Sequence, residues 1–214
     1  MTELSLDAKV AVVTGAETEI GAAVAAELAR RGAAVAVQYF ASFPRAKQVV
    51  RDIEKAGGQA VAIKADLQDR AQTELMCKKA GGAFGDVGLV VVTEPEYPDP
   101  ADGGAGGAAG EIAEAVRAQL LACLGPVYAT LPGMVARGTG TLVHVAGSAP
   151  SEPAVPGPAR AASRAAVGAA LGRLSAEYGA AGIVTHTLPS GPVQHVAQRV
   201  ALLASGAPAA DATT

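Results

Sequence analysis

The sequence contains no asparagine and no tryptophan, and no lysine follows Lys79 in a chain of 214 residues. Aromatic residues make up only 3% of the chain, so a core has to be built from Ala, Val, Leu and Ile. The net charge is −3 and no run of Lys or Arg occurs, which argues against nucleic acid or an anionic membrane surface as the main partner. Half of the residues are hydrophobic, enough for one continuous core in a single domain, residues 1–214.

Cysteine and long apolar runs are also scarce. The two cysteines, Cys77 and Cys123, fall in segments with helical spacing, which favours buried free thiols over a disulfide and suits a reducing cytoplasm. Residues Met1–Lys9 are polar and lack the apolar core of a signal peptide. No uninterrupted apolar stretch reaches the length that crosses a bilayer. We therefore expect a cytoplasmic protein with no membrane partner.

Short apolar runs alternate with segments of helical periodicity along the whole chain. This alternation predicts an α/β fold, in which a doubly wound parallel sheet of about six strands lies between two helical layers (αβα). Pro126 and Pro132 are expected to kink or split the fourth helix. Loops are predicted at Glu94–Gly110 and Ser148–Pro158. The predicted strands are Val10–Val13, Val35–Val37, Val61–Ile63, Leu89–Val92, Thr141–Val145 and Ile183–Leu188. The predicted helices are Ile20–Arg31, Pro44–Ala56, Arg70–Ala80, Ile112–Val135, Ala159–Ala180 and Val193–Leu203.

A glycine turn connects the first strand to the first helix. Residues Thr14–Gly21 read T-G-A-E-T-E-I-G, which follows the dinucleotide-binding fingerprint at its first and last glycines, Gly15 and Gly21. Glu19 stands at the middle position, where a glycine would let a pyrophosphate approach the helix N-terminus. Glu17 adds a second carboxylate, and both oppose a dianionic ligand. The alternative interpretation is that the two glycines serve packing alone.

With this turn in place, the chain resembles the short-chain dehydrogenase/reductase family, in particular its ketoacyl-reductase-like branch. The resemblance implies a Rossmann-type sheet and pairing of subunits through the two long helices. NADP(H) is a possible cofactor, but because Glu17 and Glu19 oppose its pyrophosphate we expect its binding to be weak or lost. The cofactor contacts that the resemblance implies are Thr14, Gly15, Ile20, Gly21, Asp66 and Leu67, with Asp66 on the adenine side. The segments that carry the resemblance are Leu6–Gly21, Gly32–Ser42, Ala56–Asp69, Gly125-Pro126, Gly138–Gly147, Ala161–Ala166 and Gly182–Gly191.

The chain departs from the family at each position that carries chemistry. In the family, a tyrosine donates a proton to the carbonyl oxygen, a lysine lowers the pKa of that tyrosine, a serine polarises the carbonyl and an asparagine holds a relay water. Arginine cannot replace the tyrosine as an acid, because its pKa is too high. The resemblance therefore leaves no catalytic residue. The substituted positions are Val91–Glu94 for the Asn-Asn-Ala-Gly turn, Ala122 for the helix asparagine, Arg160 for tyrosine, Arg164 for lysine, and Gly147 for serine, with Ser148 one residue off register.

The C-terminal part departs as well. After Pro189–Pro192 the chain continues almost directly into its last predicted helix, so the resemblance implies a shortened protein that lacks the substrate-covering insert and the last strand.

Three other groups of residues admit two interpretations. His144 and His186 fall in adjacent predicted strands, but no further ligand is placed to complete a metal site, so we expect buried or edge histidines and no metal. Arg160 and Arg164 lie one turn apart and either bind an anion or a partner's acids, or form a solvated face. The alanine-rich surface of Ala159–Ala180 favours close packing against a neighbour, within the chain or in another subunit.

Two functional hypotheses follow. The first is a non-catalytic or regulatory subunit that pairs with itself or with an active relative. The alternative is an NADP(H)-dependent oxidoreductase, ketoreductase-like, with an unconventional site. The alternative is supported by Asp66 and by the lack of an acidic residue at the end of the second strand, Tyr39–Ser42, which leaves space for a 2′-phosphate.

Overall fold

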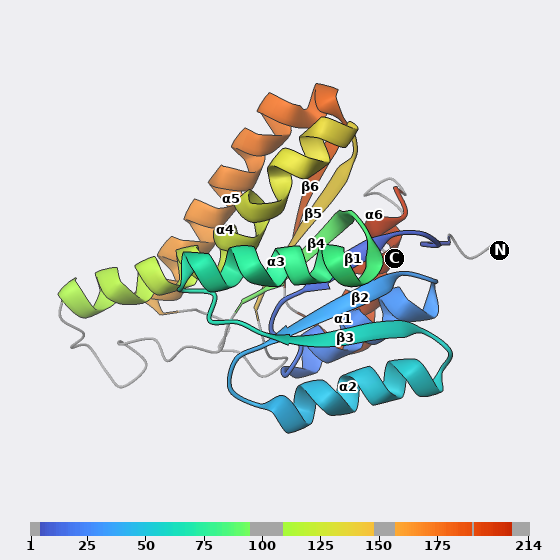
Figure 1. Ribbon diagram of the computed structural model, residues 1–214. Helices are drawn as coiled ribbons and strands as arrows, with labels where there is room; N and C mark the ends of the chain where they lie inside the picture. The colour runs from blue at the N-terminus through green and yellow to red at the C-terminus, as the bar shows by residue number, and fades with distance from the viewer. Residues whose placement is uncertain (1–4, 95–108, 148–156, 190, 207–214) are drawn as a thin grey trace.

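The computed structural model describes residues 5–94, 109–147, 157–189 and 191–206. Six strands form one parallel sheet in the order β3-β2-β1-β4-β5-β6, with the reversal of order between β1 and β4 (Figure 1). This is the Rossmann-type architecture that the alternating pattern predicts. The strands are β1 (Val10–Val13), β2 (Ala34–Tyr39), β3 (Gln59–Lys64), β4 (Val87–Thr93), β5 (Gly140–Ala146) and β6 (Ile183–Pro189).

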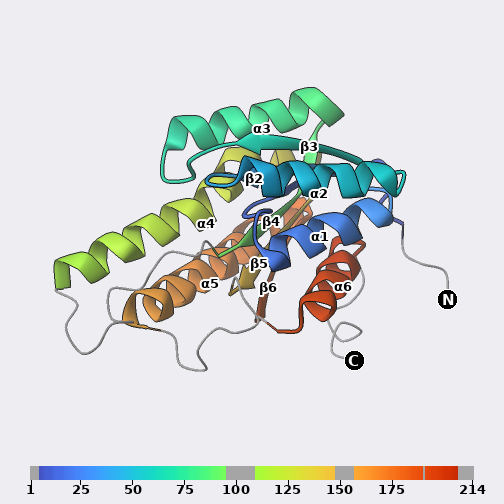
Figure 2. The ribbon, with the colours of Figure 1, turned by 90° about the horizontal axis from the view of Figure 1, so that it is seen from below.

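Helices cover both faces of the sheet, as the view from below shows (Figure 2). Alternate residues of β1 enter two separate cores, with Ala11 and Val13 facing one helical layer and Val10 and Val12 the other. The first core is completed by α1 and α6, with Ile53 of α2, and the second by α3, α4 and α5. The helices are α1 (Glu19–Arg30), α2 (Phe43–Lys55), α3 (Arg70–Phe84), α4 (Ala109–Arg137), α5 (Pro158–Tyr178) and α6 (Val193–Ala204).

The fourth helix differs from its prediction in one respect. Although Pro126 and Pro132 lie inside it, α4 is not split. Pro126 is buried, and Cys123 and Val127 near it pack in the core beneath α4; this packing supports the helix where proline cannot make a backbone hydrogen bond. The Thr130 hydroxyl also donates to the carbonyl of Pro126, at 2.9 Å. The predicted loops at 94–110 and 148–158 lie mostly outside the described residues.

One described helix, α4, is long and apolar enough by length and composition to cross a membrane, which corrects the expectation that no stretch is. The core helix of a globular protein passes the same test. In α4, 44% of the apolar window is buried inside the protein.

Candidate functional site

The glycine turn at the carboxyl end of β1 is fixed by its backbone. Gly15 has a φ of +60°, and a Cβ there would lie 2.5 Å from the Thr93 hydroxyl oxygen. A Cβ on Gly21 would lie 2.3 Å from the carbonyl oxygen of Gly15. The N-terminus of α1 can therefore pack this closely against the glycine turn only if residue 21 is glycine. Both glycines are therefore required by packing, whether or not a ligand binds.

The two acidic residues of this turn point to different places. Helix α1 begins at Glu19, which is exposed in the first turn, and the Thr18 side chain caps the helix by accepting from the amide of Gly21 at 3.1 Å. A carboxylate at that position stabilises the helix dipole and repels other anions. Glu17 instead turns toward the segment after β2.

Three consecutive backbone amides hold the Glu17 carboxylate. Oε1 accepts from the amides of Phe40 at 3.2 Å and Ala41 at 3.1 Å, and Oε2 accepts from the amide of Ser42 at 2.5 Å. These donors lie between β2 and α2, at the end of the second strand. The segment Tyr39–Ser42 contains no acidic residue of its own, but the carboxylate of Glu17 reaches it from the glycine turn.

A cavity of about 300 Å³ lies beside this contact and is lined by the glycine turn, the segment after β2 and Leu67. Gln38 bridges its floor: the amide of Gly15 donates to Gln38 Oε1 at 2.8 Å, and Gln38 Nε2 donates to the carbonyl of Ala65 at 2.9 Å. Arg45 supplies a cation to the lining. The cavity lies next to the point where the strand order reverses, which is where open α/β sheets bind ligands.

The six residues predicted to contact a cofactor are not equally placed for it. Gly15 and Leu67 line the cavity. The carboxylate of Asp66 accepts from the amide of Gln68 at 2.9 Å, which closes a local turn. The other three are buried: Gly21 packs against the backbone of Gly15, Ile20 lies in the core, and the Thr14 hydroxyl accepts from the amide of Thr93 at 3.1 Å. Their binding of a cofactor stays a prediction.

The second candidate region lies at the carboxyl end of β4. Glu94 follows this strand directly and is only 6% exposed. The guanidinium of Arg164, on α5, grips both of its oxygens: Nε lies 2.8 Å from Oε1, and Nη2 lies 2.7 Å from Oε2. This two-point geometry is the strong form of a carboxylate–arginine pair. Arg164 is thus directed into the protein, so for this residue the interpretation as a solvated face is wrong.

His144, on β5, completes the environment of Glu94. Its Nε2 lies 3.5 Å from Glu94 Oε1, at the outer limit of hydrogen bonding, and within the described chain neither ring nitrogen has a partner with good geometry. Burial alone would raise the pKa of Glu94, but His144 and the hydrogen-bonded Arg164 outweigh it, so this pKa lies below its usual value. Glu94 is therefore ionised at neutral pH.

The two histidines of adjacent strands do not meet. His186 pairs in register with Val143, and His144 pairs with Thr187. Because consecutive residues of a strand point to opposite faces, His144 and His186 lie on opposite sides of the sheet. Burial lowers the pKa of His186. The described part of the chain contains no group of three residues able to hold a metal ion.

An apolar residue stands at the position in α4 where the family has its asparagine. Ala122 is buried there, and one helical turn earlier the buried Gln119 accepts a hydrogen bond from the Ser163 hydroxyl of α5. Sequence reasoning missed Gln119, although its i, i+3 spacing from Ala122 places both on one side of α4. It noted Glu94 and Arg164 as separate substitutions but not as a pair. Ser148 lies outside the described residues.

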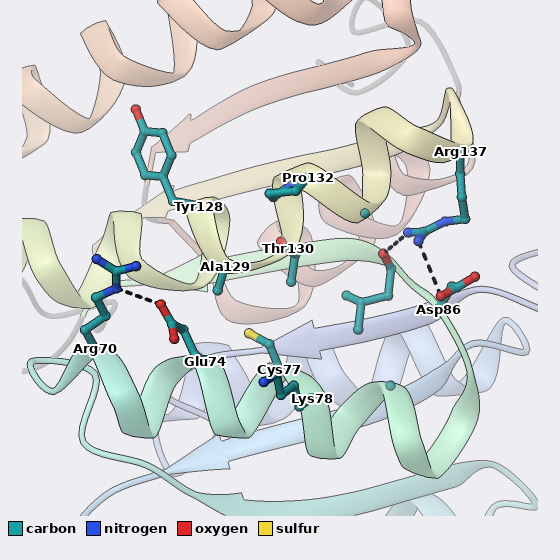
Figure 3. Close-up of a pocket in the computed structure, with 13 residues that line it drawn as sticks. Arg70, Glu74, Cys77, Lys78, Asp86, Tyr128, Ala129, Thr130, Pro132 and Arg137 are labelled. Atoms are coloured by element: carbon teal, nitrogen blue, oxygen red, sulfur yellow. Dashed lines mark hydrogen bonds and ion pairs between the residues drawn. The ribbon is translucent and has the colours of Figure 1, made fainter.

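A separate hollow of about 440 Å³ lies between α3 and α4 (Figure 3). Two ion pairs flank it, Arg70 Nε–Glu74 Oε1 at 2.6 Å and Arg137 Nη1–Asp86 Oδ1 at 3.4 Å. Neither Glu94 nor the glycine turn contributes to its lining. It is therefore distinct from the two regions at the carboxyl ends of the strands.

Comparison with known proteins identifies the family. The profile of the short chain dehydrogenase family matches residues 9–201, so the chain belongs to that family, a class of oxidoreductases. A curated relative, elsinochrome reductase 1 of Elsinoe fawcettii, is 46% identical over 86 residues, 40% of this chain and 32% of that protein. A probable tetrahydroxynaphthalene reductase of Zymoseptoria tritici is 45% identical over 105 residues, 43% of this chain and 39% of that protein. The chain thus spans well under two thirds of the length of these curated relatives.

Solved structures resemble the chain over almost its full length. A dehydrogenase/reductase from Sinorhizobium meliloti 1021 has a TM-score of 0.80 at 27% identity, covering 98% of this chain and 92% of its own. A metagenomic short-chain oxidoreductase in complex with NADP has a TM-score of 0.77 at 25% identity, covering 94% of this chain and 92% of its own. These comparisons confirm the Rossmann-type fold and the resemblance to the family.

Proposed function

We propose that this chain is a non-catalytic member of the short-chain dehydrogenase family, which acts as a subunit paired with itself or with an active relative. The observation that carries the proposal is the grip of Arg164 on the buried carboxylate of Glu94. The resemblance puts a lysine at the position of Arg164 and a tyrosine at that of Arg160. The arginine is held in an internal ion pair instead of being available to a ribose or a reacting carbonyl.

The chemistry of the pair supports this proposal. A guanidinium has no proton to give near neutral pH, and an ionised carboxylate beside it only accepts hydrogen bonds. Removing one positioned donor from such a site costs roughly 10²–10³ in rate. With Ala122 and Arg160 also in place of the family's asparagine and tyrosine, turnover of a ketone is expected to be negligible.

The outer face of α5 supports the proposed pairing. Its buried residues follow one narrow line through Ser163, Val167 and Leu171. On the opposite side, small residues are exposed, and Cβ atoms added at Gly168 and Gly172 would meet nothing within 4 Å. The exposed alanines are Ala161, Ala162, Ala165 and Ala169. No neighbour within the described chain covers this face, so the interpretation that favours a second subunit is the stronger one.

Two measurements test the proposal. The pure chain, incubated with NADPH or NADH and a panel of aromatic and aliphatic ketones, should oxidise neither cofactor above the uncatalysed rate. Substrate-dependent oxidation that persists in Arg164→Ala would contradict the non-catalytic assignment. For pairing, light scattering should give a dimer or larger, which Ala165→Arg dissociates while the exposed α3 control Ala83→Arg does not. A monomeric wild-type chain would leave only pairing with a relative, to be tested by co-expression.

The second candidate is an NADP(H)-dependent oxidoreductase with an unconventional site. It is favoured by the NADP complex of the metagenomic relative and by the cavity of about 300 Å³ at the glycine turn, although Glu17 at that cavity counts against a 2′-phosphate. It predicts substrate-dependent NADPH oxidation by the isolated chain, so the same assay separates it from the first.

A further inference from the structure

The end of β2 carries a ready anion-binding arrangement that already holds an anion. Amides of Phe40, Ala41 and Ser42 converge on one carboxylate, which is how backbone segments bind phosphate and similar oxyanions. Here the anion is Glu17, a residue of the same chain. In a dinucleotide-binding sheet, the end of the second strand is where the 2′ position of the adenine ribose is recognised.

A 2′-phosphorylated nucleotide does not fit the residues as they stand. Its phosphate would need the amides that Glu17 occupies, and it would meet the charge of that carboxylate at close range. A free 2′-hydroxyl fits better, because a carboxylate accepts a hydrogen bond from it. The cavity beside Glu17 has room for a nucleoside, with Gly15 at one side and Leu67 at the other.

We propose that Glu17 is a specificity-determining residue, an internal anion that closes the segment 40–42 to phosphate and makes the cavity select adenosine nucleotides with a free 2′-hydroxyl. This inference concerns only how the chain binds a nucleotide, and it does not depend on whether the chain catalyses a reaction. It argues against the NADP(H) dependence of the alternative hypothesis, because the acid that faces the end of β2 comes from the glycine turn.

Calorimetric titration with two probes tests the proposal. Adenosine 5′-monophosphate and adenosine 2′,5′-bisphosphate differ only in the 2′-phosphate, so the ratio of their affinities reports on that group. In Glu17→Ala the three amides and Arg45 become available, and the affinity for the bisphosphate should rise at least ~10-fold relative to the monophosphate. Glu17→Gln, which removes the charge but keeps the side chain, should give a smaller rise.

Glu19→Ala is the matched control. It removes an exposed carboxylate two residues away that contacts none of the three amides, so any gain should apply to both probes and leave their ratio unchanged. Far-ultraviolet circular dichroism checks that each variant is folded. A folded Glu17→Ala protein with an unchanged ratio, or with no bisphosphate binding at all, would overturn the inference. Neither outcome bears on the ketone assay, so failure of this inference and failure of the proposed function are distinguishable.

Discussion

Two glutamates stand at the carboxyl edge of the same sheet, and they are held in opposite ways. Glu17 is partly exposed and accepts hydrogen bonds from neutral backbone amides. Glu94 is buried and is bound by a guanidinium, and the imidazole of His144 lies 3.5 Å away. Loss of Glu17 leaves donors that water or a ligand can satisfy, whereas loss of Glu94 removes the bidentate carboxylate from a partly buried cation. We therefore expect the Glu17 contact to affect binding and the Glu94 contact to affect stability.

The largest expected loss of stability comes from removing Glu94. Glu94→Ala removes the bidentate carboxylate from the guanidinium of Arg164, whose side chain is 21% exposed, and should lower the free energy of unfolding by about 2–4 kcal/mol. Urea unfolding, followed by circular dichroism, measures it. Glu17→Ala should lose less than about 1 kcal/mol, because its donors face the cavity and solvent.

A double variant separates the charge from the packing. Glu94→Leu with Arg164→Leu removes both ions and should recover most of the stability that Glu94→Ala loses. A double variant as unstable as the single one would show that the pair supports the fold by something other than mutual neutralisation.

The second effect concerns the backbone next to Glu17. Gly21→Ala forces a Cβ against the carbonyl of Gly15, and should cost about 1–3 kcal/mol. Gly82→Ala is the control, since a Cβ there meets nothing within 4 Å in α3, and it should stabilise by about 0.5–1 kcal/mol. Equal stabilities of the two variants would mean that the turn yields easily, and the rigid geometry inferred for it would fail.

Local pattern predicts the fold well and the sites poorly. The bounds predicted for β1 are those observed, and the ends predicted for the other strands agree with the observed ends or fall short of them by one or two residues. The sites depend on pairs far apart in sequence: Glu94 and Arg164 are 70 residues apart, and Glu17 and Ser42 are 25 apart. No periodicity encodes such pairs. Likewise, the one-residue register offset that puts His144 and His186 on opposite faces is not visible in either strand alone.

A smaller effect is expected in the pH dependence of stability, to which Glu94 contributes. Because the folded-state pKa of Glu94 is lowered, its contribution to stability is fully present above the unfolded value of about 4.3 and is lost as the pH falls through the folded pKa. Urea midpoints between pH 7 and pH 3 should therefore fall more steeply for the wild type than for Glu94→Gln. Parallel curves for wild type and Glu94→Gln would contradict the ionised pair.

The smallest effect uses the two thiols as local reporters. Both are buried and free, as the sequence predicted; burial raises the pKa of Cys77 to about 11, with a contribution from Glu74, and burial also raises the pKa of Cys123. Both should react slowly with a thiol reagent at pH 8, since the thiolate is the reactive form. Cys123 lies on α4 within the electrostatic reach of Glu94 and Arg164, whereas Cys77 lies on α3. Peptide mass spectrometry should show faster labelling of Cys123, but not of Cys77, in Glu94→Ala, and neither change in Glu17→Ala. Equal acceleration at both thiols would mean that loss of Glu94 loosens the whole core and not the region around the ion pair.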